Sequence, residues 1–228
     1  MKRGMGETCE KILSGFAAGV MIAASVWSLL LPAIERSARP QWLWATIGFV
    51  FGVLFLIACE TISERWQTSG VAGRVGNKNR MLIFAVTLHN LPEGMAVGVA
   101  LAGALCAGTR QSFAAAMVLA VGIAVQNIPE GAIISMPLAG EGYGKAKAFL
   151  CGVLSGVVEP IGAALTLLLT AAIVKLLPLL LAFAAGAMVY VCVNELIPAA
   201  KSEKNAALGA VSFSAGFLVM MILDVALG

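Results

Sequence analysis

The stretch TLHNLPEGMAVG, residues 87–98, places a histidine, an asparagine, a proline and a glutamate inside an apolar run. A second stretch, AVQNIPEGAIIS, begins 37 residues later and repeats the asparagine, the proline and the glutamate at the same spacing. An unpaired charge is costly in apolar surroundings, so each glutamate needs either a partner or a proton. The repeated motif therefore indicates a polar site shared by two apolar segments.

The composition is that of a membrane protein. The 228-residue chain is 60% hydrophobic and 12% charged, whereas soluble proteins average about half apolar and about a quarter charged residues. Helices are expected because lipid offers backbone polar groups no partner and because the alternation of a barrel strand is absent. We predict an all-α polytopic membrane protein with a single transmembrane domain over residues 1–228. Seven stretches are near or above the roughly 20 residues needed to cross a bilayer: 12–31, 41–59, 81–109, 111–140, 148–174, 176–194 and 205–223.

Lysine and arginine are unevenly distributed between the two sides of these spans. Eleven of the 15 lie on the side of the N-terminus, which also holds the longest polar segment, residues 60–80. Because positive residues favour the cytoplasm, that side is predicted to be cytoplasmic and residues 60–80 to form a cytoplasmic loop. The net charge of +3 thus reflects topology and gives no support to nucleic-acid binding. The five cysteines form no CxxC pair, so we expect them to serve as small packing residues.

Self-comparison reveals an inverted repeat. FAAGVM at 16–21 recurs as FAAGAM at 183–188, and the Gly-Phe pair at 48–49 recurs at 216–217. An odd number of crossings separates the copies, so they face opposite ways, as in many transporters. By the same offset, the fifth span should have a copy ahead of residue 1. We therefore expect an eight-helix bundle of which this chain carries seven helices, with the first helix missing.

Three glutamates, Glu93, Glu130 and Glu159, lie well inside the predicted spans, and no lysine or arginine lies at that depth. A charged residue at the centre of a membrane helix costs roughly 2.5 to 3.5 kcal/mol to insert. The three carboxyl groups must therefore carry protons or surround a cation.

Helical spacing favours the cation. His89 and Glu93 are four residues apart and share one helix face, and Gln126 and Glu130 repeat this arrangement on the next span. In each motif an asparagine lies one position further on, about 100° around the helix, where it can reach a second location beside the same glutamate. The predicted metal ligands are His89, Asn90, Glu93, Gln126, Asn127, Glu130 and Glu159.

The donor types restrict the metal. Nitrogen and oxygen ligands without thiolate suit Zn²⁺, Fe²⁺, Mn²⁺, Cd²⁺ or Co²⁺ better than Cu⁺, and the histidine argues against Mg²⁺ or Ca²⁺. Carboxylate and amide ligands also exchange more readily than a closed cysteine cage, and transport needs release as much as binding.

The HNxPEG and QNxPEG motifs, the GVVEP segment and the span FAAGVMIAASVWSLLLPAIE resemble the ZIP family of Zrt- and Irt-like metal transporters, in particular its GufA-like bacterial branch. The resemblance runs over nearly the whole chain from residue 14. It implies an eight-helix fold with inverted three-helix repeats around a central pair, and a two-metal site at mid-membrane. The implied first metal ligands are His89, Glu93, Gln126 and Glu130, and the second set is Asn90, Glu93, Asn127, Glu130 and Glu159.

Two features depart from many relatives. The segment 60–80 has no histidine, so the metal-gathering cluster of many relatives is absent. Asn127 supplies a neutral amide where some relatives carry a carboxylate, which should weaken the second metal.

The expected function is transport of divalent transition-metal ions toward the cytoplasm, zinc foremost and also iron, manganese and cadmium. No enzymatic activity and no prosthetic group are expected. The expected partners are the metal ions and the lipid bilayer, with a homodimer left open, and the expected location is the bacterial inner membrane.

Three alternatives remain. A proton or solute carrier could use the three glutamates as a relay, and a metal-sensing membrane scaffold would use the same ligands without transport. An intramembrane metalloprotease would need an HExxH motif, which a chain with a single histidine cannot provide.

Overall fold

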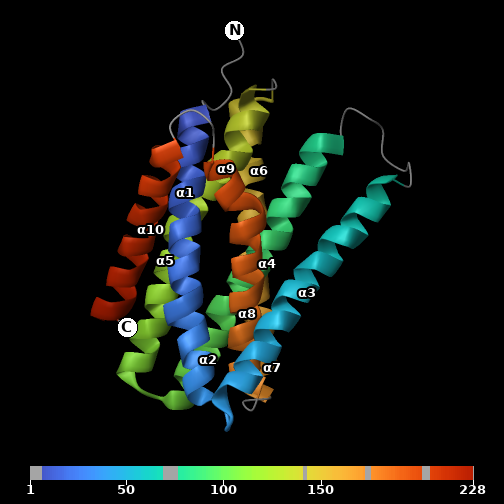
Figure 1. Ribbon diagram of the computed structural model, residues 1–228. Coiled ribbons are helices and arrows are strands. Elements are labelled where there is room, and N and C mark those ends of the chain that lie inside the picture. The colour runs from blue at the N-terminus through green and yellow to red at the C-terminus, as the bar shows by residue number, and fades with distance from the viewer. Residues whose placement is uncertain (1–6, 69–76, 141–142, 173–175, 202–205, 228) are drawn as a thin grey trace.

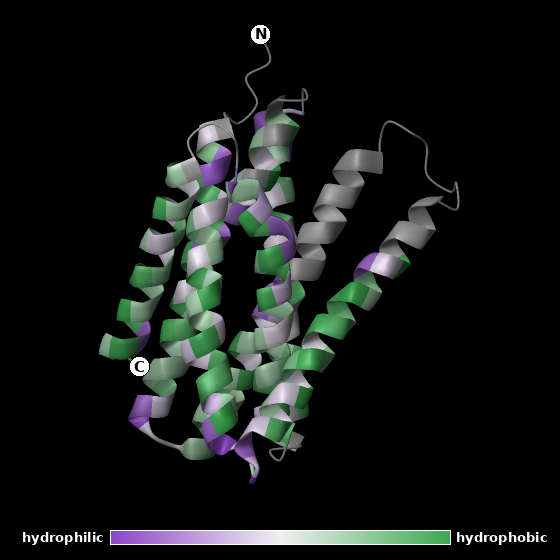
Figure 2. Ribbon diagram, viewed as in Figure 1, coloured by the Kyte–Doolittle hydropathy of each residue, from purple (hydrophilic) through white to green (hydrophobic). Residues whose placement is uncertain are grey.

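The architecture was obtained as a computed structural model, which describes residues 7–68, 77–140, 143–172, 176–201 and 206–227. Seven helices within these ranges are long and apolar enough to cross a membrane, which confirms the prediction of an all-α polytopic membrane protein. They form one bundle (Figure 1). Hydrophobic residues run along the helices, and hydrophilic residues gather mainly near the ends (Figure 2).

Helical segments follow one another with short connections. In chain order they are α1 (Glu7–Ala24), the π-helical turn η1 (Ser25–Leu30), α2 (Leu31–Arg36), α3 (Gln41–Thr68), α4 (Asn77–Ala107), α5 (Arg110–Gly140), α6 (Lys145–Gly156), α7 (Val158–Ala172), α8 (Leu177–Val191), the π-helical turn η3 (Cys192–Leu196), α9 (Ile197–Ala200) and α10 (Ala206–Leu227).

The helices pack in pairs: α1 on α10, α3 on α8, α4 on α7 and α5 on α6. Gly19 and Gly186, which occupy the same position in the two FAAG copies, allow close backbone contact in the first two pairs. A Cβ added at Gly19 would lie 2.7 Å from the Phe217 nitrogen, and one at Gly186 would lie 2.8 Å from the Phe49 carbonyl carbon. Small residues of this kind let membrane helices approach closely, so the repeated sequence encodes repeated packing.

The repeat is also visible in the irregular turns. η1 begins at Ser25 and η3 at Cys192, which matches the 167-residue offset of the FAAG copies, and α1 and α8 run in opposite directions (Figure 1). Both turns end just before a proline, Pro32 or Pro198. A proline ring conflicts with the carbonyl four residues earlier in a regular helix, and the wider π turn relieves that conflict.

Two boundaries differ from the hydropathy-based expectation. α3 continues to Thr68 and α4 begins at Asn77, so the loop expected over 60–80 is shorter, because hydropathy marks the end of an apolar stretch rather than the end of a helix. The fifth span is divided at Val157 into α6 and α7. Pro160 explains the break, because it has no N–H to bond to the Gly156 carbonyl.

Candidate metal centre

The three intramembrane glutamates come together from three helices. Glu93 on α4 is fully buried, and Glu130 on α5 is buried. Glu159 lies in the first turn of α7 and is partly buried. Glu93 interacts electrostatically with both of the others. The bundle therefore concentrates three acidic groups within the apolar layer.

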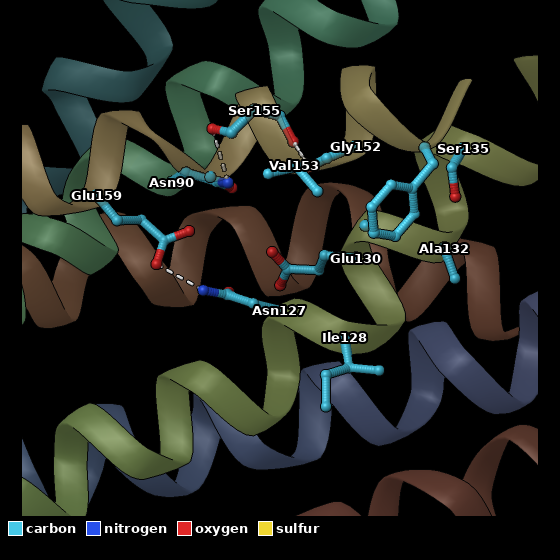
Figure 3. A pocket seen from close by; sticks show the side chains of 13 residues that line it. Asn90, Asn127, Ile128, Glu130, Ala132, Ser135, Gly152, Val153, Ser155 and Glu159 are labelled. Carbon is cyan, nitrogen blue, oxygen red and sulfur yellow. Dashed lines mark hydrogen bonds between the residues drawn. The ribbon is translucent and has the colours of Figure 1, made fainter. Parts of the chain in front are cut away.

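Two asparagines beside these glutamates each donate a hydrogen bond from the side-chain nitrogen. The Asn90 side-chain Nδ2 donates to the Ser155 carbonyl at 3.1 Å, and the Asn127 Nδ2 donates to Glu159 Oε2 at 2.5 Å (Figure 3). The Oδ1 atom of each asparagine is buried and has no hydrogen-bond partner. Each amide thus uses its donor on the protein and leaves its acceptor free for a cation.

Unpartnered polar atoms are concentrated here. Among the described residues, ten buried side-chain nitrogen and oxygen atoms lack a hydrogen-bond partner, and eight of them belong to the six ligand candidates Asn90, Glu93, Gln126, Asn127, Glu130 and Glu159. Buried polar groups are nearly always satisfied in native proteins, so a cluster of exceptions indicates an ion or water that completes it. Most of the free atoms are oxygens, the ligand type of hard and borderline cations.

A cavity of about 380 Å³ adjoins these groups and is lined by Glu130, Glu159, Ser135 and Phe149, among others. In Figure 3 the carboxylates of Glu130 and Glu159 point into the same space between α5 and α7. Phe149 lies near the start of α6 and is 68% exposed. The cavity therefore extends from the carboxylates toward the start of α6.

Comparison with known families identifies the chain. The sequence profile of the ZIP zinc transporter family matches residues 69–224. The chain belongs to the ZIP family. It is 33% identical to the zinc transporter ZIP11 of Xenopus tropicalis, over 94% of this chain and 87% of that protein. It is 34% identical to the zinc transporter ZIPB of Bordetella bronchiseptica, over 99% and 74%, and 36% identical to the zinc transporter GufA of Myxococcus xanthus, over 89% and 81%. These proteins are named as transporters, in agreement with the expectation that the chain is not an enzyme.

The two PEG motifs of this ZIP chain differ in their surroundings. A Cβ added at Gly94 would lie 2.6 Å from the Glu159 Cα, whereas one added at Gly131 would have its nearest contact at 4.0 Å. Gly94 therefore lets α4 press against the backbone that carries Glu159. Gly131 lines the cavity and has room beside it.

The remaining predicted ligands are placed as follows. Gln126 is fully buried and lies beside Glu93. The backbone of His89 is part of α4, and its side chain lies outside the described residues. Among the described side chains, no group of three His, Cys, Asp or Glu residues is close enough to hold one metal ion. Glu93, Glu130 and Glu159 are therefore neighbours that do not form such a group by themselves.

Sequence reasoning missed one residue at this centre. Ser155 orients Asn90 through its main-chain carbonyl, a role that no side-chain pattern reveals.

Proposed function

We propose that this ZIP chain transports divalent transition-metal ions, zinc foremost and also iron, manganese and cadmium, toward the cytoplasm. The ions would pass through a mid-membrane centre with two metal positions. The first would use His89, Glu93, Gln126 and Glu130, and the second Asn90, Glu93, Asn127, Glu130 and Glu159. The names of ZIP11, ZIPB and GufA as zinc transporters support the choice of substrate.

The observation that carries this proposal is the concentration of unpartnered polar atoms. In the part of the chain that the structure describes, eight of ten such atoms lie on α4, α5 and α7, around two buried carboxylates and a partly buried one. Acidic groups inside a membrane are rare and mark ion pathways. Their ligation by a metal ion displaces protons and satisfies the free oxygens. The cavity beside Glu130 gives an ion bound there a direction in which to leave.

Zinc uptake into proteoliposomes tests the proposal. Glu130→Gln preserves the size of the side chain and removes its charge, so uptake should fall to the level of empty liposomes. The matched control is Glu10→Gln, which changes an exposed acid near the start of α1 and should leave uptake unchanged. Wild-type uptake equal to that of empty liposomes, with folded protein in the vesicles, would overturn the proposal.

A second candidate is the proton or solute relay. It is favoured by the electrostatic interactions of Glu93 with Glu130 and of Glu130 with Glu195, because a relay needs acids that influence one another. The same proteoliposomes with a pH-sensitive dye inside distinguish the two functions. Proton flux in the absence of metal that disappears in Glu130→Gln, without any zinc uptake, would favour the relay.

We also place the protein in the bacterial inner membrane, because two of the similar transporters come from bacteria. The exposed apolar faces of α3 and α10 would then contact lipid, since they carry large hydrophobic side chains such as Phe51 and Leu218.

A further inference from the structure

A second cavity, of about 220 Å³, lies where η1, α2, α5 and α10 meet. These elements approach one another toward one end of the bundle (Figure 1). The cavity, called the Asp224 cavity below, is lined by Trp27, Ser28, Arg36, Ser112 and Asp224, together with small and apolar residues. Its described lining thus holds one acidic and one basic side chain.

The carboxylate of Asp224 has one oxygen in use and one free. The Ser28 hydroxyl donates a hydrogen bond to Asp224 Oδ1 at 2.5 Å, which ties η1 to α10. Asp224 Oδ2 is buried and has no hydrogen-bond partner. A buried carboxylate oxygen in this state needs a proton or a cation. Asp224 therefore provides a binding point for a cation beside the cavity.

Arg36 brings a permanent positive charge to the same cavity. It is the last residue of α2, and its side chain crosses to α4, where a Cβ added at Gly103 would overlap Arg36 Nη1. The glycine thus leaves room for the guanidinium group between the two helices. The cavity is comparable in width to the roughly 8 Å over which physiological salt screens a charge. Arg36 therefore acts on any cation that approaches Asp224.

The Asp224 cavity lies on the route to the candidate metal centre. Ala100 on α4 also lines the cavity and comes seven residues after Glu93. This spacing is nearly two full turns, so the two residues share one helix face about 10 Å apart. An ion that enters at this end and follows that face of α4 would pass Asp224 and Arg36 before it reaches Glu93.

We propose that Arg36 determines how readily the Asp224 cavity captures a hydrated divalent cation, because its guanidinium group competes with the ion for Asp224. Without metal, the guanidinium offsets the charge of the acid. With metal, it weakens the attraction, so that the ion is held loosely and passes on toward Glu93, as transport requires. This inference rests on the proposed transport function and on the predicted orientation, which makes this end the entry side.

Initial rates of zinc uptake into proteoliposomes test the role of Arg36. Arg36→Gln removes the charge and should raise uptake at subsaturating zinc by about three- to tenfold, the low end of electrostatic effects on association, with the maximal rate nearly unchanged. Arg36→Lys keeps the charge and should stay close to the wild type. The matched control is Arg39→Gln, which changes an exposed arginine outside the described lining of the cavity and should leave uptake unchanged.

Salt dependence gives a second readout that a purely structural role of Arg36 would not alter. In the wild type the charges of Arg36 and Asp224 nearly cancel, so uptake at subsaturating zinc should vary little between about 20 and about 200 mM NaCl. Arg36→Gln leaves the carboxylate alone, so its uptake should fall clearly as salt rises. Arg39→Gln should keep the weak dependence of the wild type.

A double substitution tests whether Arg36 acts through Asp224. Asp224→Asn removes the group for which the guanidinium competes, and it should lower uptake at subsaturating zinc. Adding Arg36→Gln to this variant should change uptake by less than about twofold, because two groups that interact are not additive. Thermal unfolding of each variant in detergent verifies that it is folded.

The outcomes separate this inference from the function on which it rests. Unchanged uptake in Arg36→Gln, or an equal rise in Arg39→Gln, would overturn the role of Arg36 and leave zinc transport standing. A full effect of Arg36→Gln in the protein that lacks Asp224 would also overturn that role. Folded wild-type protein without any zinc uptake would overturn both the inference and the transport function.

Discussion

Glu93 shows at the scale of one residue what a buried acid requires in an apolar bundle. Its buried carboxyl lies beside the Gln126 amide, and its electrostatic neighbours are the acids Glu130 and Glu159. The metal-free protein must therefore hold mutually repelling groups or their protons. Metal binding removes this conflict, so it should stabilise the fold strongly.

This leads to a prediction for Glu93→Gln. Zinc at about 100 times its dissociation constant should stabilise the wild-type protein by about 2.7 kcal/mol, and most of this gain should be absent in the variant. The metal-free variant should be at least as stable as the metal-free wild type, because one like-charged group is gone. Thermal unfolding in detergent, with and without zinc, measures both effects. A zinc-induced gain equal to that of the wild type would contradict the assignment of Glu93.

Asn127 gives a second prediction at this scale. Asn127→Asp adds a charge to the second metal position, and because affinity rises with ligand charge we expect the second zinc to bind roughly tenfold more tightly. Without metal the variant should be less stable, because the bond to Glu159 is replaced by repulsion. Calorimetric titration measures the affinity, with Asn127→Ala as the variant expected to weaken it. Unchanged second-site affinity in Asn127→Asp would argue against the ligand role.

Spacing along the sequence could nominate Glu93 and Glu130 together with their neighbouring amides, because each glutamate lies about one helical turn from the amides of its own motif. It could not nominate the Ser155 carbonyl, which depends on which helices meet in space and belongs to no local polar pattern.

At the scale of helices, the two PEG glycines make a matched pair. Gly94→Ala should force α4 away from the backbone of Glu159, destabilising the protein by roughly 1 to 3 kcal/mol as overpacking usually does and weakening zinc binding. Gly131→Ala has open space beside it and should be neutral or stabilising by up to about 1 kcal/mol, because alanine favours helix. Unfolding and zinc titration of both variants test this difference. Equal effects would show that close packing at Gly94 does not position Glu159.

The number and type of spans could be predicted because each consists of a long apolar stretch. The two FAAG copies also predicted that the spans carrying them run in opposite directions. The π turns before Pro32 and Pro198 could not, since a proline in a membrane helix is accommodated in several ways. The break at Val157 escaped prediction for the same reason. These irregular points nevertheless carry Cys192 and Glu159 at or next to them.

At the scale of the whole molecule, the distribution of positive residues predicts the orientation. Cys106 is exposed near the end of α4 and Cys9 lies near the start of α1, so the two should face opposite sides of the membrane. In intact cells a membrane-impermeant maleimide should label a protein that retains Cys106 alone and spare one that retains Cys9 alone. Detergent should make both reactive, as the control. The reverse pattern in intact cells would invert the topology.

The matched turns η1 and η3 have a consequence for the direction in which ions are transported. Two identical inverted halves would present the same barrier to an ion from either side, and the gradient alone would set the direction. Any rectification must come from positions where the copies differ. Across these turns, Ser25 corresponds to Cys192 and Ser28 to Glu195, so η3 carries a thiol and a carboxyl group where η1 carries two hydroxyl groups. An ion would therefore meet different side chains at the two turns, and this difference would give a fold built of inverted repeats a preferred direction of transport.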